Sequence, residues 1–187
     1  MDTLAPLQQK IEVEIGDKKN YPIGIFGSFK KGNKIFLHSL RNFLNEKEYN
    51  ARYSEDLQLE FPPKKDEEKY GYSRKLSELL IETSKIYVIF FFLEIAGDHE
   101  TNQSASMELE ILNQQKKKNV LIFIEDEYFK QSKSLFKGLK TQTSTLWSWQ
   151  SFTRYDHYNT DLYEDDNIDS SAMQACYNFI LEMRFGS

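Results

Sequence analysis

Two apolar runs of strand length stand out in the pattern of hydrophobic and polar positions. Residues 86–93 read Ile-Tyr-Val-Ile-Phe-Phe-Phe-Leu, and residues 120–124 read Val-Leu-Ile-Phe-Ile. Continuous runs of this kind are typical of strands buried on both faces of a parallel sheet. A polar loop and a helical segment, residues 102–110, lie between them. If the two strands are parallel neighbours, this loop and the first helical turn lie at the carboxyl edge of the sheet, where open α/β folds bind ligands.

The rest of the chain continues the alternation. Residues 22–26 and 50–53 predict two more strands, and residues 10–15 alternate like an edge strand. Helical spacing of apolar residues predicts helices over about residues 35–46, 128–139 and 172–185, and a further helix that begins with Ser73 as its N-cap. Residues 60–72 predict a loop. Residues 146–152 predict a last strand, in which Trp147, Trp149 and Phe152 form one buried aromatic face or stack on a base.

This order of elements predicts the fold class. Strands that alternate with helices imply a parallel sheet covered on both faces, with right-handed crossovers. We expect an α/β three-layer sandwich with a central five-stranded, mainly parallel sheet in the flavodoxin-like order 2-1-3-4-5. The 187 residues suffice for one domain over 1–187. Its core covers about residues 21–185, with 1–20 as an N-terminal extension or edge strand.

Composition and charge limit the kinds of partner and of binding site that we expect. The net charge of −5 offers no global basic surface for a phosphodiester backbone, so no nucleic-acid partner is expected. The run at 86–93 is far shorter than the roughly 20 apolar residues that span a membrane. One cysteine, Cys176, and a polar N-terminus without a leader favour a cytoplasmic protein, with Cys176 in the core. The three histidines, His38, His99 and His157, lack metal-ligand spacing, so no metal site is expected.

Glu108 is the candidate catalytic residue. When an N-glycosidic bond breaks, positive charge develops on the sugar, and a carboxylate beneath the anomeric carbon can stabilise or trap it. A place near a helix N-terminus favours the ionised carboxylate by roughly 0.3–1 kcal/mol, which predicts a nucleophile rather than an acid. Gly27 would let its loop approach a ligand without a Cβ, and Ser28 would offer a hydrogen bond. In the alternative interpretation, Glu108 faces solvent and Ser104 is the N-cap of its helix.

Three features follow one another within residues 23–125: a short strand that ends in Gly27-Ser28, Ser84 before the third core strand, and a Ser-x-x-x-Glu-Leu segment that contains Glu108. With these features, this part of the chain resembles the nucleoside 2-deoxyribosyltransferase family. In that family the segment reads Asp-x-Gly-Thr-x-x-Glu-Leu-Gly, and its Glu attacks the anomeric carbon of a nucleoside. Here the Glu-Leu pair is retained, with Asn102 in place of Asp and Ser104 in place of Gly.

The chain is also similar to TIR-type NAD-cleaving domains, which carry a catalytic Glu on the helix after the third strand. Both resemblances imply a nucleoside or dinucleotide partner, no resident cofactor, and NAD as a candidate substrate. Family members often build their pocket between subunits, which implies a homo-oligomer. The residues implied are Glu108 as the catalytic group and, for substrate binding, Gly27, Ser28, Phe29, Asn102 and Ser104.

Two classes of function therefore stay open. The first is an enzyme that cleaves or transfers at an N-glycosidic bond through Glu108, which the retained Glu-Leu pair favours. The second is a non-catalytic nucleotide-binding or protein-interaction module of the same fold, which the absence of the family's Asp residues favours. An enzyme predicts Glu108 in a pocket beside Gly27 and Ser28. A module predicts an exposed Glu108 or one held in a structural ion pair.

Overall fold

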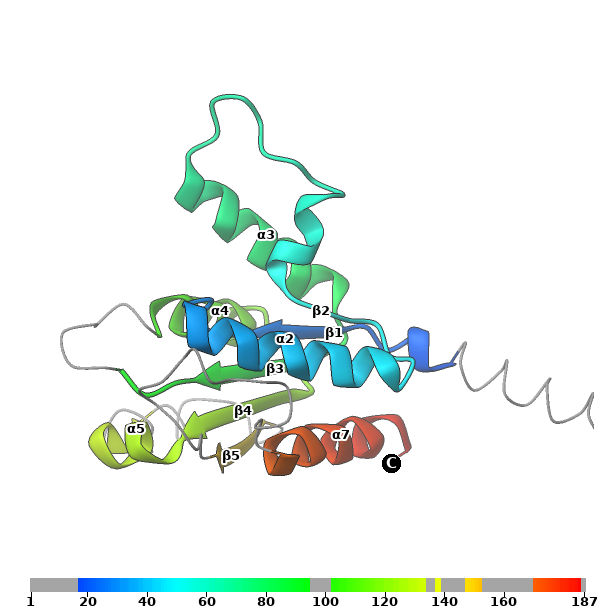
Figure 1. Ribbon diagram of the computed structural model, residues 1–187, viewed down its shortest axis with the longest axis vertical. Coiled ribbons are helices and arrows are strands. Elements are labelled where there is room, and N and C mark those ends of the chain that lie inside the picture. Colours follow the sequence, from blue (N-terminus) through cyan, green and yellow to red (C-terminus); the bar gives the residue numbers. More distant parts are fainter. Residues whose placement is uncertain (1–16, 95–101, 134–136, 139–146, 153–169, 186–187) are drawn as a thin grey trace, which may run out of the picture.

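A five-stranded parallel sheet lies at the centre of the protein (Figure 1). The computed structural model describes residues 17–94, 102–133, 137–138, 147–152 and 170–185. Every strand pairs with its neighbour in parallel, and the strand order is β2-β1-β3-β4-β5. The predicted order 2-1-3-4-5 is thus confirmed. The strands are β1 (Ile23–Phe26), β2 (Ala51–Arg52), β3 (Ile86–Phe91), β4 (Val120–Glu125) and β5 (Ser148–Phe152).

Helices cover both faces of the sheet and make the three-layer sandwich that the alternation predicts (Figure 1). One face packs against α2 and α7, and the other against α3, α4 and α5. In Figure 1, α3 and the short 3-10 helix η1 project away from the body of the sheet. The bounds are α2 (Lys31–Glu46), η1 (Ser54–Gln58), α3 (Lys69–Thr83), α4 (Gln103–Gln114), α5 (Asp126–Gln131) and α7 (Ser170–Phe185).

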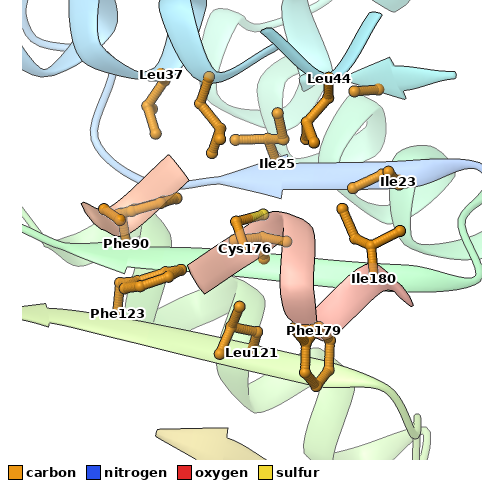
Figure 2. Close-up of a cluster of buried hydrophobic side chains, with 14 of the residues drawn as sticks. Ile23, Ile25, Leu37, Leu44, Phe90, Leu121, Phe123, Cys176, Phe179 and Ile180 are labelled. Carbon is orange, nitrogen blue, oxygen red and sulfur yellow. The ribbon is translucent and has the colours of Figure 1, made fainter. Parts of the chain in front are cut away.

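Aromatic side chains fill the layer between the sheet and the α2–α7 face (Figure 2). Phe90 of β3 stacks on Phe123 of β4, with ring centroids 4.8 Å apart and planes inclined by 6°. Phe36 of α2 meets Phe90 edge to face at 5.2 Å. Such pairs add about 0.5–1.5 kcal/mol each beyond the burial of their surface. Cys176 of α7 lies fully buried in this layer, as predicted.

The opposite face of the same strands is equally apolar. Tyr87, Ile89 and Phe91 alternate with the inward residues of the first layer and pack with α3, α4 and α5. Burial on both faces explains why β3 reads as an uninterrupted apolar run instead of alternating.

Helix α3 starts earlier than its sequence predicts. It begins at Lys69, and its N-cap is Glu68, whose side chain makes no capping bond, so the prediction of Ser73 as N-cap was wrong. Gly71 and the charged residues around it indicated a loop. Instead, tertiary contacts fix the first turn, because Tyr72 is buried and its hydroxyl donates to the backbone oxygen of Phe61 at 2.8 Å. Local propensity is a weak guide where such packing is present.

The predicted aromatic face of the last strand also needs correction. Trp147 and Trp149 pack on the side of α3 to α5, whereas Phe152 packs on the side of α2 and α7. Strand residues whose numbers differ by an odd amount point to opposite faces of the sheet, as Trp149 and Phe152 do. Trp147 further donates its indole N–H to the backbone oxygen of Lys117 at 3.0 Å. These aromatic residues therefore belong to two core layers.

Some predicted features fall at the margins of the described chain. The predicted edge strand at residues 10–15 lies outside the described residues, whereas Asp17 to Lys19 form a helical turn. The helix predicted over 128–139 begins at Asp126, directly after β4, and ends at Gln131. In the part of the chain that the structure describes, no helix has the length and apolarity to cross a membrane.

Candidate functional site

A cleft of about 760 Å³ lies beside the carboxyl ends of β1, β2 and β3. Its walls come from the loop after β1, from η1 after β2, from the first half of α3 and from the start of α4. In a sheet of order 2-1-3-4-5, the crossovers from β1 and β3 diverge between these two strands, and this switch point is where open α/β folds bind ligands. Residues from all four walls include Phe29, Glu55, Tyr70, Ser77, Ser104 and Glu108.

Glu108 is buried where α4 meets α3. It is the sixth residue of α4, lines the cleft and is only 2% exposed. Its Oε1 accepts a 2.8 Å hydrogen bond from the hydroxyl of Ser77, itself buried on α3. Its Oε2 is buried without a hydrogen-bond partner among the described residues. Within the same described ranges, no cationic side chain forms an ion pair with this carboxyl.

Burial decides the ionisation of this carboxyl. Desolvation raises the pKa of Glu108 from 4.5 to about 8, and the Ser77 hydroxyl and the Gly27 backbone N–H only partly offset that rise. The expectation that the helix dipole would keep Glu108 ionised was therefore wrong. The helix dipole acts most strongly in the first turn of α4, and Glu108 lies beyond that turn. The cost of burying an unpaired charge is larger than the stabilisation that the dipole supplies. In the free protein, the neutral acid prevails at pH 7.

Gly27 contributes through its backbone. Its φ of +153° falls in a region that side chains rarely adopt, and a Cβ there would lie 3.2 Å from the backbone oxygen of Phe90 and 3.3 Å from the ring of Phe92. Packing and conformation thus require glycine, and this places the Gly27 N–H where it favours the ionised form of Glu108. Gly27 is not among the described residues that line the cleft.

Ser28 and Phe29, which follow Gly27, have different surroundings. Ser28 is buried, and its hydroxyl oxygen accepts a 3.4 Å hydrogen bond from the backbone N–H of Lys30, which shapes the loop after β1. Phe29 lines the cleft, and its ring packs on Tyr53 with centroids 5.3 Å apart. Of these two predicted binding residues, the structure brings Phe29 to the cleft.

The two predicted binding residues at the start of α4, Asn102 and Ser104, also have different surroundings. Ser104 is exposed in the first turn of α4 and lines the cleft, but it is not the N-cap, because that position belongs to Asn102. Asn102 is buried, and its side-chain amide pairs with the backbone of Phe92. Its Oδ1 accepts from the Phe92 N–H at 2.8 Å, and its Nδ2 donates to the Phe92 oxygen at 2.7 Å. Asn102 therefore secures the end of β3 to the start of α4.

Sequence reasoning missed the contribution of α3. Ser77 touches the candidate catalytic carboxyl, and Arg74 and Tyr70 line the same cleft about one and two turns earlier in α3. The available signal was a small polar residue within the apolar stripe of α3, between Leu76 and Leu80. The charge of Arg74 is paired outside the lining, since Arg74 bonds Glu78 at 2.8 Å and Glu78 is not among the described residues that line the cleft.

Among the residues described, no group of three or more His, Cys, Asp or Glu side chains is placed to hold a metal ion. No protein-family model matches the sequence, and no curated protein matches it either.

Proposed function

We propose that this protein cleaves or transfers at the N-glycosidic bond of a nucleoside or a nicotinamide dinucleotide, with Glu108 beneath the anomeric carbon. The observation that carries the proposal is the state of Glu108. Its carboxyl is buried in the wall of a ligand-sized cleft, with one oxygen held by Ser77 and no ion pair among the described residues. A buried titratable group with a strongly displaced pKa in a cleft is typical of a functional site.

The raised pKa of Glu108 fits chemistry in which positive charge arrives with the substrate. A cation within a few ångströms stabilises a carboxylate and lowers its pKa. An oxocarbenium-like sugar supplies that charge as the bond breaks, and an N-linked pyridinium base supplies it earlier. The carboxylate then bonds to the anomeric carbon while the bonding electron pair leaves with the base. Water or a second base next displaces the carboxylate and takes the sugar.

The cleft also offers groups that suit such a substrate. Phe29 presents an aromatic ring on which a base can stack, and Met107 and Tyr70 add apolar surface, with the Tyr70 hydroxyl 3.8 Å from the Met107 sulfur. The Ser104 hydroxyl on α4 supplies a hydrogen-bonding group on the same cleft. These features support a ligand with one flat, apolar part and one polar part, as a nucleoside has.

A second candidate is a non-catalytic nucleotide-binding module that uses the same cleft. The raised pKa of Glu108 favours it, because a protonated carboxyl can hydrogen-bond a ligand but is a poor nucleophile. Such a module would bind nucleosides or NAD without releasing the base. Binding and base release therefore separate the two candidates.

The test is a substrate screen with purified full-length protein. The protein and its Glu108→Gln variant are incubated with NAD and a panel of ribonucleosides and deoxyribonucleosides, and free base is followed by chromatography. Each sample is also sized, because a pocket shared between subunits would be incomplete in a monomer. Base release by the parent but not by the variant supports the enzyme. Binding without release, at a known assembly state, supports the module.

A further inference from the structure

We propose that Ser77 is the positioning residue of the site, which holds the Glu108 carboxyl in one orientation in the wall of the cleft. The role of Ser77 in catalysis rests on the proposed function. The hydrogen bond between Ser77 and Glu108 depends only on how α3 packs against α4.

The two side chains come from segments far apart in the chain. Ser77 and Glu108 are 31 positions apart, yet the hydroxyl lies 2.8 Å from Oε1, and the two residues are 6% and 2% exposed. A serine hydroxyl has a single proton to donate. Its donation to Oε1 fixes the orientation of the carboxyl, whereas Oε2 is buried without a hydrogen-bond partner within the described residues. That oxygen keeps its full capacity to accept a hydrogen bond.

The surroundings of Ser77 keep this arrangement in place. Its neighbours Leu76, Leu80 and Ile81 are buried in the layer that also contains Ala105 and Leu109 of α4. This apolar packing fixes α3 against α4 and so keeps the Ser77 side chain beside the carboxyl. A buried hydroxyl with no bond costs free energy, which disfavours rotation away from the carboxyl.

The bond also has an electrostatic consequence that can be measured. The Ser77 hydroxyl lowers the pKa of Glu108, in opposition to the larger effect of burial. Removing the hydroxyl would therefore raise that pKa further and make the ionised carboxylate harder to form. A residue that only filled space would leave the titration of Glu108 unchanged.

The experiment compares Ser77→Ala and Ser77→Thr with the parent chain. Glu108 is titrated by carbon-13 NMR in glutamate-labelled full-length protein, with the signal assigned by its loss in Glu108→Gln. We expect the midpoint to move upward by about one pH unit in Ser77→Ala and to return toward the parent value in Ser77→Thr, which keeps the hydroxyl. Ser106→Ala, exposed on α4, serves as the matched control and should leave the midpoint unchanged.

The NMR titration tests the role of Ser77, and the rate of base release tests the proposed function. An unchanged midpoint in a folded Ser77→Ala protein would overturn the positioning role, whether or not the parent turns over a substrate. If the parent does release base, Ser77→Ala should lower kcat more than it changes KM and move the kcat/KM profile to higher pH. Absence of turnover with the expected NMR displacement would reject the enzyme while the positioning role stands.

Discussion

The hydroxyl of Ser77 lies 2.8 Å from Oε1 of Glu108, and this hydrogen bond joins the projecting helix α3 to the start of α4 inside the protein. A carboxyl buried with only the neutral Ser77 hydroxyl and Gly27 N–H to favour its charge, and with no counter-ion among the described residues, is costly when ionised. Burial thus raises the pKa of this carboxyl to about 8 in the wall of a cleft at the carboxyl edge of the sheet. The predictions below follow from that arrangement and from the packing that supports it.

The stability of the protein should fall as the pH rises from about 4.5 to about 8. In that window the folded state keeps a proton on Glu108, whose pKa is raised to about 8, while the unfolded chain has lost it near 4.5. The slope from this group is at most about 1.4 kcal/mol per pH unit. Glu108→Gln cannot ionise, so its free energy of unfolding should exceed that of the parent increasingly with pH. Urea unfolding of both proteins across this range measures the difference, and parallel curves would refute the raised pKa.

The rate of base release should rise with pH. If Glu108 acts as the ionised nucleophile, kcat/KM depends on the fraction of free protein that has lost the proton, and it should level off above about pH 8. A general acid would give the reverse profile, with activity lost as the pH passes the same value. Initial rates at low substrate concentration over this range distinguish the two roles of Glu108.

Gly27→Ala should destabilise the fold and disturb the site. The φ of +153° and the close backbone oxygen of Phe90 oppose a Cβ, at a cost of about 1–3 kcal/mol. Gly71→Ala is the matched control, because a methyl group added at Gly71 inside α3 would meet nothing within 4 Å and alanine favours a helix by up to about 1 kcal/mol. Thermal unfolding of both variants should show opposite displacements of Tm. Equal effects would mean that Gly27 is not conformationally required.

Phe90→Ala should be among the most damaging core substitutions. Phe90 is fully buried and packs against Phe36 and Phe123, so removing its ring should cost about 3–5 kcal/mol. Leu59→Ala removes an apolar side chain that is 95% exposed, and it should change the free energy of unfolding by less than about 0.5 kcal/mol. Chemical denaturation of the two variants compares them directly. A cost below about 1 kcal/mol for Phe90→Ala would contradict the packing described for this layer.

Much of the architecture could be predicted from the sequence because its signals are local and strong. The uninterrupted apolar runs of β3 and β4 require burial on both faces, and the alternation with helices then leads to the parallel order that the structure has. Helix starts were predicted less well, because the first turn of α3 depends on Tyr72 reaching the backbone of Phe61. No local pattern reveals such a tertiary contact.

The location of the site could also be predicted from the sequence, whereas the contacts of its residues could not. Glu108, Phe29 and Ser104 reach one cleft, as the order of strands predicts. The ionisation of Glu108 could not be predicted, since it depends on burial and on Ser77, which another helix supplies. Asn102 matched a position of a ligand-binding motif, yet its amide is used by the backbone of Phe92. The chemistry of a polar residue is thus decided by what the fold places beside it.

The most direct test compares two glutamates on one helix. Glu108 is buried in the cleft wall, whereas Glu110, two positions further along α4, is exposed. Rates of base release are measured for the parent, Glu108→Gln and Glu110→Gln on the substrate that the parent prefers. We predict a loss of at least about a hundredfold for Glu108→Gln and a rate close to that of the parent for Glu110→Gln. Equal rates for both variants would contradict the assignment of Glu108 as the reacting carboxyl.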